Sequence, residues 1–362
     1  MNHARIPALV ALCAAIIVTL PACGFKKNLR ANADARRLTF GVSVQAGDVF
    51  DPKAIKLIRE NFNEIVPENA MKWRNIRPTK GFWNWSDMDG MVAFAEKNNI
   101  RMKGHVFLWH QQNPPYVDGL KTRDEALALM TDQISTIMAR YKGRIYEYDV
   151  ANEVLNDDGS MRGTVWYRTI GDDYLDIAFR TAHKADPAAR LILNDYGNEY
   201  AGTPKGDAFY ALVKGLVTRG APISGVGLQL HVQAHDIVDE SALRETIKRF
   251  RDLGLFVTFS EVDVRIAMPV TPEKEAEQVA AYTKLMEVAL SEPNAASFVM
   301  WGYTDKLSWI PAFFPGYGSA HLFDRDVKPK AAYRAIEAML AQREKESGQA
   351  ANAEVRTGKK KA

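Results

Sequence analysis

Eight short apolar segments recur along the chain and alternate with segments of helical periodicity. Strands that alternate with amphipathic helices are typical of α/β folds, in which each helix connects two parallel strands. Eight such repeats predict a single closed (β/α)₈ barrel, the TIM-barrel architecture. A doubly wound open sheet is disfavoured because no GxGxxG or GxxxxGK[ST] motif follows any strand. The segments are "LTFGVSV", "FNEIVPE", "IRMKGHVFLWH", "IYEYDVANE", "RLILNDY", "GVGLQLHV", "LFVTFSEVDV" and "SFVMWGYTD".

Polar flanks set the domain boundaries. The barrel domain is expected over residues 38–343, because no low-complexity stretch or Pro/Gly/Ser-rich linker interrupts this range. Residues 23–37, which include "KKNLRANADARR", are expected to form a tether, and residues 344–362 a polar tail without regular structure. One domain is therefore the simplest organisation.

The first 22 residues have a basic start, an apolar run and then small residues. This pattern is typical of a signal peptide rather than a membrane-spanning helix. The stretch "LPAC" resembles the lipobox of bacterial lipoproteins, which implies lipid attachment at Cys23. An exported lipoprotein is expected, anchored in the outer membrane or on the periplasmic face; without the lipid it would be secreted or periplasmic. Cys13 and Cys23 are the only cysteines, so the domain has no disulfide framework.

Composition excludes several classes of protein. The 362 residues are 47% hydrophobic and 25% charged, which suits a globular protein with a large core. The net charge of +3 leaves no broad cationic surface for nucleic acid. We expect a monomer whose only membrane contact is the N-terminal lipid.

Polar side chains stand at or just after the ends of seven of the eight strand segments. In a barrel these ends face one mouth, where burial of so many polar groups is costly unless they meet a ligand. The sequence therefore predicts a polar ligand site. Asp195 and Asp263 are interpreted as groups that orient a neighbour, and His110 as a framework residue. The set is Glu68, Asn69, Lys72, His105, Trp109, His110, Asn152, Glu153, Asn194, Asp195, Gln229, His231, Glu261, Asp263, Trp301 and Asp305.

Two glutamates on opposite strands give this mouth its chemistry. Glu153 ends the fourth segment and Glu261 lies in the seventh, across the barrel. A protonated and an ionised carboxyl group facing one another are what glycoside hydrolysis requires. No HExxH motif and no G-x-S-x-G elbow is present, so no metal, no cofactor and no serine nucleophile is expected.

The same segments resemble glycoside hydrolase family 10, the endo-β-1,4-xylanases. The resemblance covers about residues 38–340 in seven blocks that follow the family order. They are "FNEIVPENAMKW", "RMKGHVFLWHQQNPPYV", "YDVANEVL", "LILNDYGNE", "GLQLHV", "TFSEVDVR" and "WGYTDKLSWIPAFFPGYGSAHLFDRDVKPKAAY".

The resemblance implies a role for each matching position. Glu153 is expected to be the general acid/base and Glu261 the nucleophile. Asn152 would bind the 2-hydroxyl of the −1 sugar, and His231 would hold the carboxylate of Glu261. Gln229 would lie beside Glu153, and Asp263 would fix His231. The other expected substrate-binding residues are Glu68, Asn69, Lys72, His105, Trp109, Gln112, Tyr196, Trp301 and Trp309.

These roles describe a retaining endo-β-1,4-xylanase that cleaves xylan and xylo-oligosaccharides by double displacement. Three alternatives stay open: a surface lipoprotein that binds glycans without turnover, a family 10 enzyme specialised for short oligosaccharides, and a metal-dependent hydrolase. Tyr148 stands where the family usually has tryptophan, and its hydroxyl needs a partner if it is buried.

Overall fold

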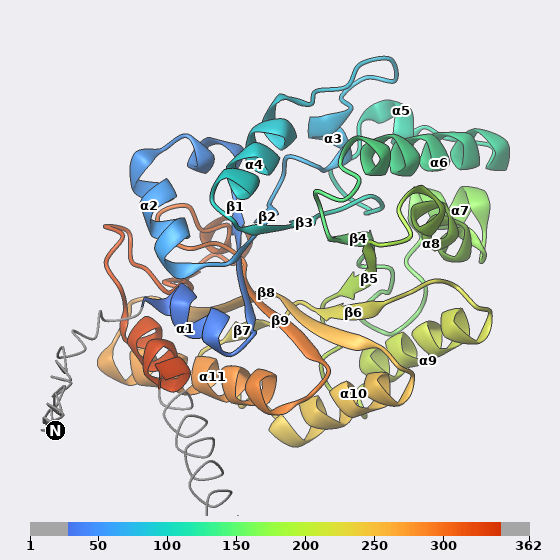
Figure 1. Ribbon diagram of the computed structural model, residues 1–362. Coiled ribbons are helices and arrows are strands. Elements are labelled where there is room, and N and C mark those ends of the chain that lie inside the picture. The colour runs from blue at the N-terminus through green and yellow to red at the C-terminus, as the bar shows by residue number, and fades with distance from the viewer. Residues whose placement is uncertain (1–27, 342–362) are drawn as a thin grey trace, which may run out of the picture.

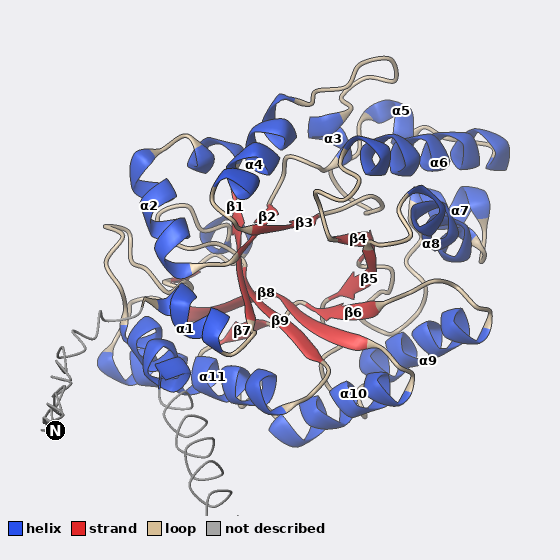
Figure 2. Ribbon diagram, in the orientation of Figure 1, coloured by secondary structure: helices blue, strands red, loops and turns tan. Residues whose placement is uncertain are grey.

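A closed barrel of eight parallel strands forms the centre of the protein. The computed structural model describes residues 28–341. The strands run in the order β1-β2-β3-β4-β5-β6-β8-β9, and β9 pairs again with β1. Figures 1 and 2 show this ring along its axis, with the helices on the outside. The predicted (β/α)₈ barrel is confirmed, whereas the predicted signal peptide, Cys23 and the tail over residues 344–362 lie outside the described residues.

Each of the eight predicted apolar segments overlaps a barrel strand. The strands are β1 (Thr39–Val44), β2 (Glu64–Pro67), β3 (Arg101–Gly104), β4 (Glu147–Asn152), β5 (Arg190–Asp195), β6 (Gly225–Leu228), β8 (Phe256–Ala267) and β9 (Ala295–Met300). The main connecting helices are α2 (Pro52–Asn61), α4 (Ser86–Lys97), α6 (Arg123–Arg140), α8 (Tyr174–Ala185), α9 (Pro204–Thr218), α10 (Glu240–Asp252) and α11 (Pro272–Ser291). Shorter elements are α1 (Leu29–Ala35), η1 (Ala46–Val49), α3 (Trp73–Ile76), α5 (Pro115–Asp118), α7 (Val165–Ile170), β7 (His231–Gln233), α12 (Ile310–Phe313) and β10 (Tyr317–Gly318).

Local sequence explains where the helices begin and which face they bury. Thr203 and Thr271 cap α9 and α11, and each is followed by a proline whose fixed φ suits the first helical position. On α10 the buried residues recur every three or four positions, which turns one face toward the barrel. Within residues 28–341, no helix is long and apolar enough to span a bilayer.

The predicted tether is wrong for its second half. Residues 29–35 form α1, whose N-terminus is capped by the side chain of Asn28. Leu29 and Ala33 are fully buried in the core, and Asn63 donates a hydrogen bond to Asp34. This short, polar segment has little helical signal of its own. Its burial comes from tertiary contacts, so the folded domain begins before residue 38.

The sixth predicted strand is split in two. β6 ends at Leu228 and β7 begins at His231, because Leu230 between them adopts a positive φ of 59°. β7 pairs with β8, and His231 lies opposite Asp263 in that register. The break therefore brings a histidine to the strand that carries Glu261.

Tyr148 is fully buried, and its hydroxyl has no hydrogen-bond partner among residues 28–341. The ring instead stacks on Phe107, with centroids 5.1 Å apart. A Cβ at Gly104 would lie 2.4 Å from Cδ1 of Tyr148, so only glycine fits beside the ring. Packing, rather than hydrogen bonding, holds this side chain.

Buried charges fill the barrel interior. Lys103 Nζ lies 2.8 Å from Asp149 Oδ1 and 3.4 Å from Glu147 Oε1. Glu64 is also fully buried and accepts a hydrogen bond from the hydroxyl of Tyr146. Burial, together with the charge of Glu147, raises the pKa of Glu64 to about 7. Three carboxyl groups thus share one lysine, which favours retention of a proton by Glu64.

This burial predicts how stability depends on pH. Since the pKa of Glu64 is higher in the folded than in the unfolded state, the folded state binds more protons between about pH 4.5 and 7. The contribution of Glu64 to stability is therefore full below this window and is lost as the pH rises through it. Glu64→Gln should flatten the decline in unfolding free energy that chemical denaturation measures from pH 5 to 8. The exposed substitution Glu60→Gln on α2 should follow the wild type, and an equal flattening there would contradict the assignment.

Candidate active site

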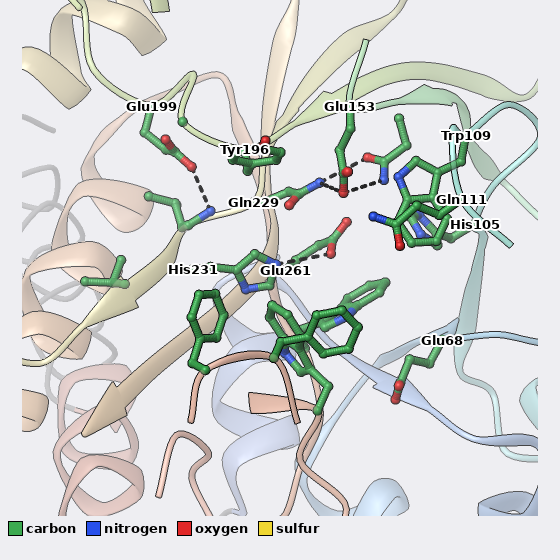
Figure 3. Close-up of a pocket in the computed structure, with 18 of the residues that line it drawn as sticks. Glu68, His105, Trp109, Gln111, Glu153, Tyr196, Glu199, Gln229, His231 and Glu261 are labelled. Carbon is green, nitrogen blue, oxygen red and sulfur yellow. Dashed lines mark hydrogen bonds and ion pairs between the residues drawn. The ribbon is translucent and has the colours of Figure 1, made fainter. Parts of the chain in front are cut away.

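One pocket of about 830 Å³ opens at the carboxyl ends of the barrel strands. Figure 3 shows the carboxyl groups of Glu153 and Glu261 pointing toward one another inside it, with Glu68 at one end and Glu199 at the other. Every residue predicted to be catalytic or substrate-binding lines this pocket. They are Glu68, Asn69, Lys72, His105, Trp109, Gln112, Asn152, Glu153, Tyr196, Gln229, His231, Glu261, Trp301 and Trp309.

Irregularities in two strands aim the two glutamates. The register of β4 against β5 shifts between Asp149 and Ala151, just before Glu153. The register of β8 against β9 shifts between Phe259 and Val262, around Glu261. A β-bulge bends a strand and redirects its side chains. Glu153 also has a positive φ of 55°, which turns the chain out of the barrel wall.

Glu261 lies between a cation and an amide. Asn194 Nδ2 donates to Glu261 Oε1 at 2.6 Å, and His231 Nε2 lies 3.4 Å from Oε2. His231 Nδ1 lies 2.9 Å from Asp263 Oδ2. Burial alone would lower the pKa of His231, but the charges of Asp263 and Glu261 outweigh it and raise that pKa to about 10. The imidazolium therefore places a positive charge beside the carboxyl group of Glu261.

Glu153 has a different environment. Its Oε1 accepts hydrogen bonds from Asn152 Nδ2 at 3.2 Å and Gln229 Nε2 at 3.3 Å. His110 Nδ1 lies 3.6 Å from Oε2. Burial lowers the pKa of His110, although the charge of Glu153 opposes this shift. A neutral imidazole beside Glu153 gives it no fixed positive charge, in contrast to Glu261.

A chain of amides links the two carboxyl groups. Asn152 Oδ1 accepts from Asn194 Nδ2 at 2.9 Å and from Gln229 Nε2 at 3.1 Å. Ser260 Oγ in turn donates to Asn194 Oδ1 at 2.6 Å, which fixes the orientation of that amide. Since Asn194 also binds Glu261 and Gln229 binds Glu153, the positions of the two glutamates are coupled. Such a network holds both groups with little freedom to reorganise.

A connected polar set occupies the end of the pocket near Glu68. Asn69 donates to Glu68 Oε1 at 3.4 Å and accepts at Oδ1 from Lys72 and Gln112, both at 3.3 Å. Burial raises the pKa of Glu68 and lowers that of Lys72. Lys72 Nζ also lies 4.6 Å from the ring centroid of Trp109. Donors and acceptors thus surround this end, as hydroxyl recognition requires.

Aromatic rings form one wall of the pocket. His105 meets Trp301 edge to face, with centroids 5.0 Å apart, and its Nδ1 lies 2.9 Å from Asp149 Oδ2. Trp309 donates from Nε1 to Asp263 Oδ2 at 2.9 Å. Asp263 itself is fully buried behind the pocket. It therefore orients both His231 and Trp309, in agreement with the contact expected between Asp263 and His231.

The other side of the pocket carries Tyr196 and its partners. Lys205 Nζ lies 3.3 Å from the centroid of the Tyr196 ring and 3.0 Å from Asp195 Oδ1. Burial raises the pKa of Asp195 to about 6, although Lys205 opposes the shift. Arg162 donates to the Tyr196 hydroxyl at 3.0 Å and to the backbone oxygen of Glu153 at 2.9 Å. Asp195 thus supports neighbouring groups, as its interpretation from sequence stated.

The roles of several residues in or beside the pocket were not predicted. The sequence placed Asn194 at a strand end but gave no sign that it would bridge two carboxyl groups. His110, interpreted from the sequence as a framework residue rather than a catalyst, lines the pocket beside Glu153. Arg162 and Glu199 lie in loops, where no periodic pattern indicates which way a side chain points. Within residues 28–341, no group of three His, Cys, Asp or Glu side chains is arranged to hold a metal ion.

Comparison with known proteins places this site in a family. The model of glycosyl hydrolase family 10 matches residues 28–339. The chain is similar to endo-1,4-beta-xylanase B of Thermotoga neapolitana, with 34% identity over 322 residues that cover 86% of this chain and 92% of the relative. It is also similar to endo-1,4-beta-xylanase 1 of Gibberella zeae, with 35% identity over 280 residues that cover 75% of this chain and 79% of the relative.

Solved structures agree. Xylanase 10B from Thermotoga petrophila RKU-1 in complex with xylobiose superposes with a TM-score of 0.85 at 35% identity, covering 88% of this chain and 98% of that chain. Native xylanase 10B from Thermotoga maritima gives a TM-score of 0.85 at 36% identity, covering 88% and 99%. A family match over most of the chain, close structural similarity and one pocket with paired glutamates agree: the chain belongs to glycosyl hydrolase family 10.

Proposed function

We propose that the protein is a retaining endo-β-1,4-xylanase that hydrolyses internal bonds of xylan and xylo-oligosaccharides. The observation that carries the proposal is the pair of glutamates joined through amides in one pocket, one of them beside an imidazolium. The xylobiose complex of the Thermotoga petrophila relative supports a xylan-type substrate. No step of the mechanism needs a cofactor.

In the first step Glu261 attacks the anomeric carbon of the −1 sugar. A bond forms between this carbon and a carboxylate oxygen while the bond to the glycosidic oxygen breaks. Glu153 gives its proton to the departing oxygen. The charge of His231 beside Glu261 supports this division of roles, whereas the group within ion-pair distance of Glu153 is the imidazole of His110, whose pKa is lowered by burial.

In the second step water releases the covalent intermediate. Glu153, now ionised, takes a proton from the water molecule. The water oxygen bonds to the anomeric carbon at the same time, and the carboxylate of Glu261 leaves. The amide of Asn152 bonds to Glu153 and neighbours the −1 position, where a contact with the 2-hydroxyl would strengthen as the ring flattens. Two inversions at one carbon give net retention.

The shape of the pocket supports binding of a chain on both sides of the cleaved bond. The polar set around Glu68 offers hydroxyl recognition at one end, and Tyr196 offers an aromatic face on the other side. Figure 3 places these groups on opposite sides of the glutamate pair. An endo-acting enzyme needs subsites in both directions, which this arrangement provides.

The role of Glu261 predicts the effect of removing it. Wild-type protein should release a series of xylo-oligosaccharides from linear xylan, as chromatography of the products measures. Glu261→Ala should lower kcat by about 10⁴-fold or more because no covalent intermediate can form. Its melting temperature should stay near that of the wild type. The exposed control Glu277→Ala on α11 should retain activity, and near-normal turnover by Glu261→Ala would refute the proposal.

The role of Glu153 predicts a different pattern. Glu153→Ala should lose turnover on xylan but still form the intermediate on aryl xylobiosides with good leaving groups, because these need no proton. Azide should restore turnover and give a glycosyl azide of retained configuration, which NMR identifies. Glu261→Ala under the same conditions should give no such product. Equal losses in the two variants, neither relieved by azide, would contradict the assigned roles.

We also propose that the protein is an exported monomer anchored by a lipid on Cys23, as its N-terminal sequence supports. Labelled palmitate fed to expressing bacteria should enter the wild-type protein and not Cys23→Ser. Cys13→Ser serves as the matched control, because Cys13 lies within the expected signal peptide, and should leave labelling intact. Equal labelling of wild type and Cys23→Ser would exclude this anchor.

A further inference from the structure

A second buried histidine lies behind the active-site pocket. His321 follows β10 in the chain and is fully buried. Neither of its ring nitrogens has a hydrogen-bond partner among the described residues. A neutral imidazole carries one donor and one acceptor, and burying both without partners costs free energy. The groups around His321 indicate its role.

Strand register places His321 beside the back of the nucleophile strand. β10 pairs antiparallel with β8, with Tyr317 opposite Ala267 and Gly318 opposite Ile266. Val264 donates its backbone N–H to Ala320 O at 3.3 Å, so the antiparallel course continues. One further residue puts His321 opposite Asp263, the aspartate that orients His231.

The backbone behind Trp301 confines the ring from another side. Gly302 adopts a φ of 115°, and a Cβ there would lie 2.8 Å from Cε1 of His321. Only glycine allows the imidazole to approach this closely. His321 therefore packs directly against the chain that follows a pocket-lining tryptophan.

One carboxylate oxygen in this region lacks a donor. Asp263 Oδ2 accepts from His231 and Trp309, whereas Asp263 Oδ1 is buried without a partner in the described chain. The nearby Asp305 is already satisfied: its Oδ1 accepts from the backbone N–H of His321 at 2.8 Å, and its Oδ2 accepts from Lys330 Nζ at 3.1 Å.

The charge state of His321 suits a donor to Asp263. Burial lowers the pKa of His321, the charges of Asp305 and Asp263 oppose this, and those of Lys330 and His231 add to it. The ring is therefore neutral at physiological pH. A neutral ring offers one N–H to a carboxylate without adding a second cation next to His231.

We propose that His321 is a positioning residue for the nucleophile, which donates its ring N–H through one enclosed water molecule to Asp263 Oδ1. Buried waters commonly satisfy such groups. With both oxygens engaged, Asp263 cannot rotate, so His231 stays directed at Glu261. The inference rests on the proposed function, because it assigns Glu261 as the nucleophile.

The test compares the pH dependence of kcat/KM on an aryl xylobioside for three proteins. His321→Leu removes the donor at similar volume and should lower kcat/KM about tenfold, mainly through kcat. The acidic limb should move up by about half a pH unit because His231 is then held less firmly against the nucleophile. The alkaline limb should not move. His321→Gln, which keeps a donor, should restore most of the activity.

Tyr282→Phe is the matched control. Tyr282 donates to Ala320 O at 2.6 Å, so its loss loosens the same segment without removing a donor to Asp263. It should lower the melting temperature yet leave the acidic limb in place. The proposal is overturned if the profile of His321→Leu superposes on that of the wild type, if both limbs move together, or if Tyr282→Phe reproduces the shift.

A measurement on the wild type keeps the proposal testable if His321→Leu does not fold. Histidine labelled with ¹⁵N should show a neutral His321 whose ring proton exchanges slowly and whose resonance moves in Asp263→Asn. A charged or rapidly exchanging ring, or one indifferent to Asp263→Asn, would refute it. Failure of this inference can be told apart from failure of the proposed function. The NMR measurement needs no turnover, and the kinetic comparison is made only if the wild type is active.

Discussion

Two acidic side chains, Glu153 and Glu261, face one another in one pocket, and the surrounding structure holds them there. Like charges at close range repel, so each carboxyl group needs a different partner set. Glu261 has an imidazolium and an amide donor, whereas Glu153 has two amides and a neutral ring. The amides of Asn152 and Asn194 connect the sets. The same hydrogen-bond network thus gives the two glutamates different surroundings and holds them in position.

The barrel supplies what this network cannot provide alone. β8 extends over twelve residues, so a single strand carries Glu261 in the pocket and Asp263 behind it. The break at Leu230 separates β7 from β6, and the pairing of β7 with β8 brings His231 next to Glu261 and Asp263. Below the pocket, Lys103 and its acidic neighbours replace the apolar side chains that usually fill a barrel. Asp149 belongs to that interior and also bonds to His105, so the floor and the wall of the pocket are continuous.

Sequence predicts the parts of this protein that repeat or that stand at strand ends. The eight strands were found because β-forming runs alternate with helical periodicity, and the pocket because polar groups cluster where apolar runs stop. The features that the sequence did not predict depend on contacts between segments far apart in the chain. Helix α1 is a short and mostly polar segment, and its buried apolar side chains are those of Leu29 and Ala33. Glu64 and Glu147 are the first residues of β2 and β4, and the sequence does not show that both lie near the charge of Lys103 from β3. Asn194 bridges Asn152 and Glu261, with its amide oriented by Ser260 from another strand.

The two described ends of the chain meet on one side of the barrel. Arg36, just after α1, donates from Nε to the backbone oxygen of Leu340, in the helical segment over residues 331–341. Figure 1 shows these elements next to one another. Because α1 leads into the amino end of β1, this junction lies at the base of the barrel, opposite the mouth. A surface, bead or fusion partner joined at either described end would therefore lie on the side of the barrel away from the cleft.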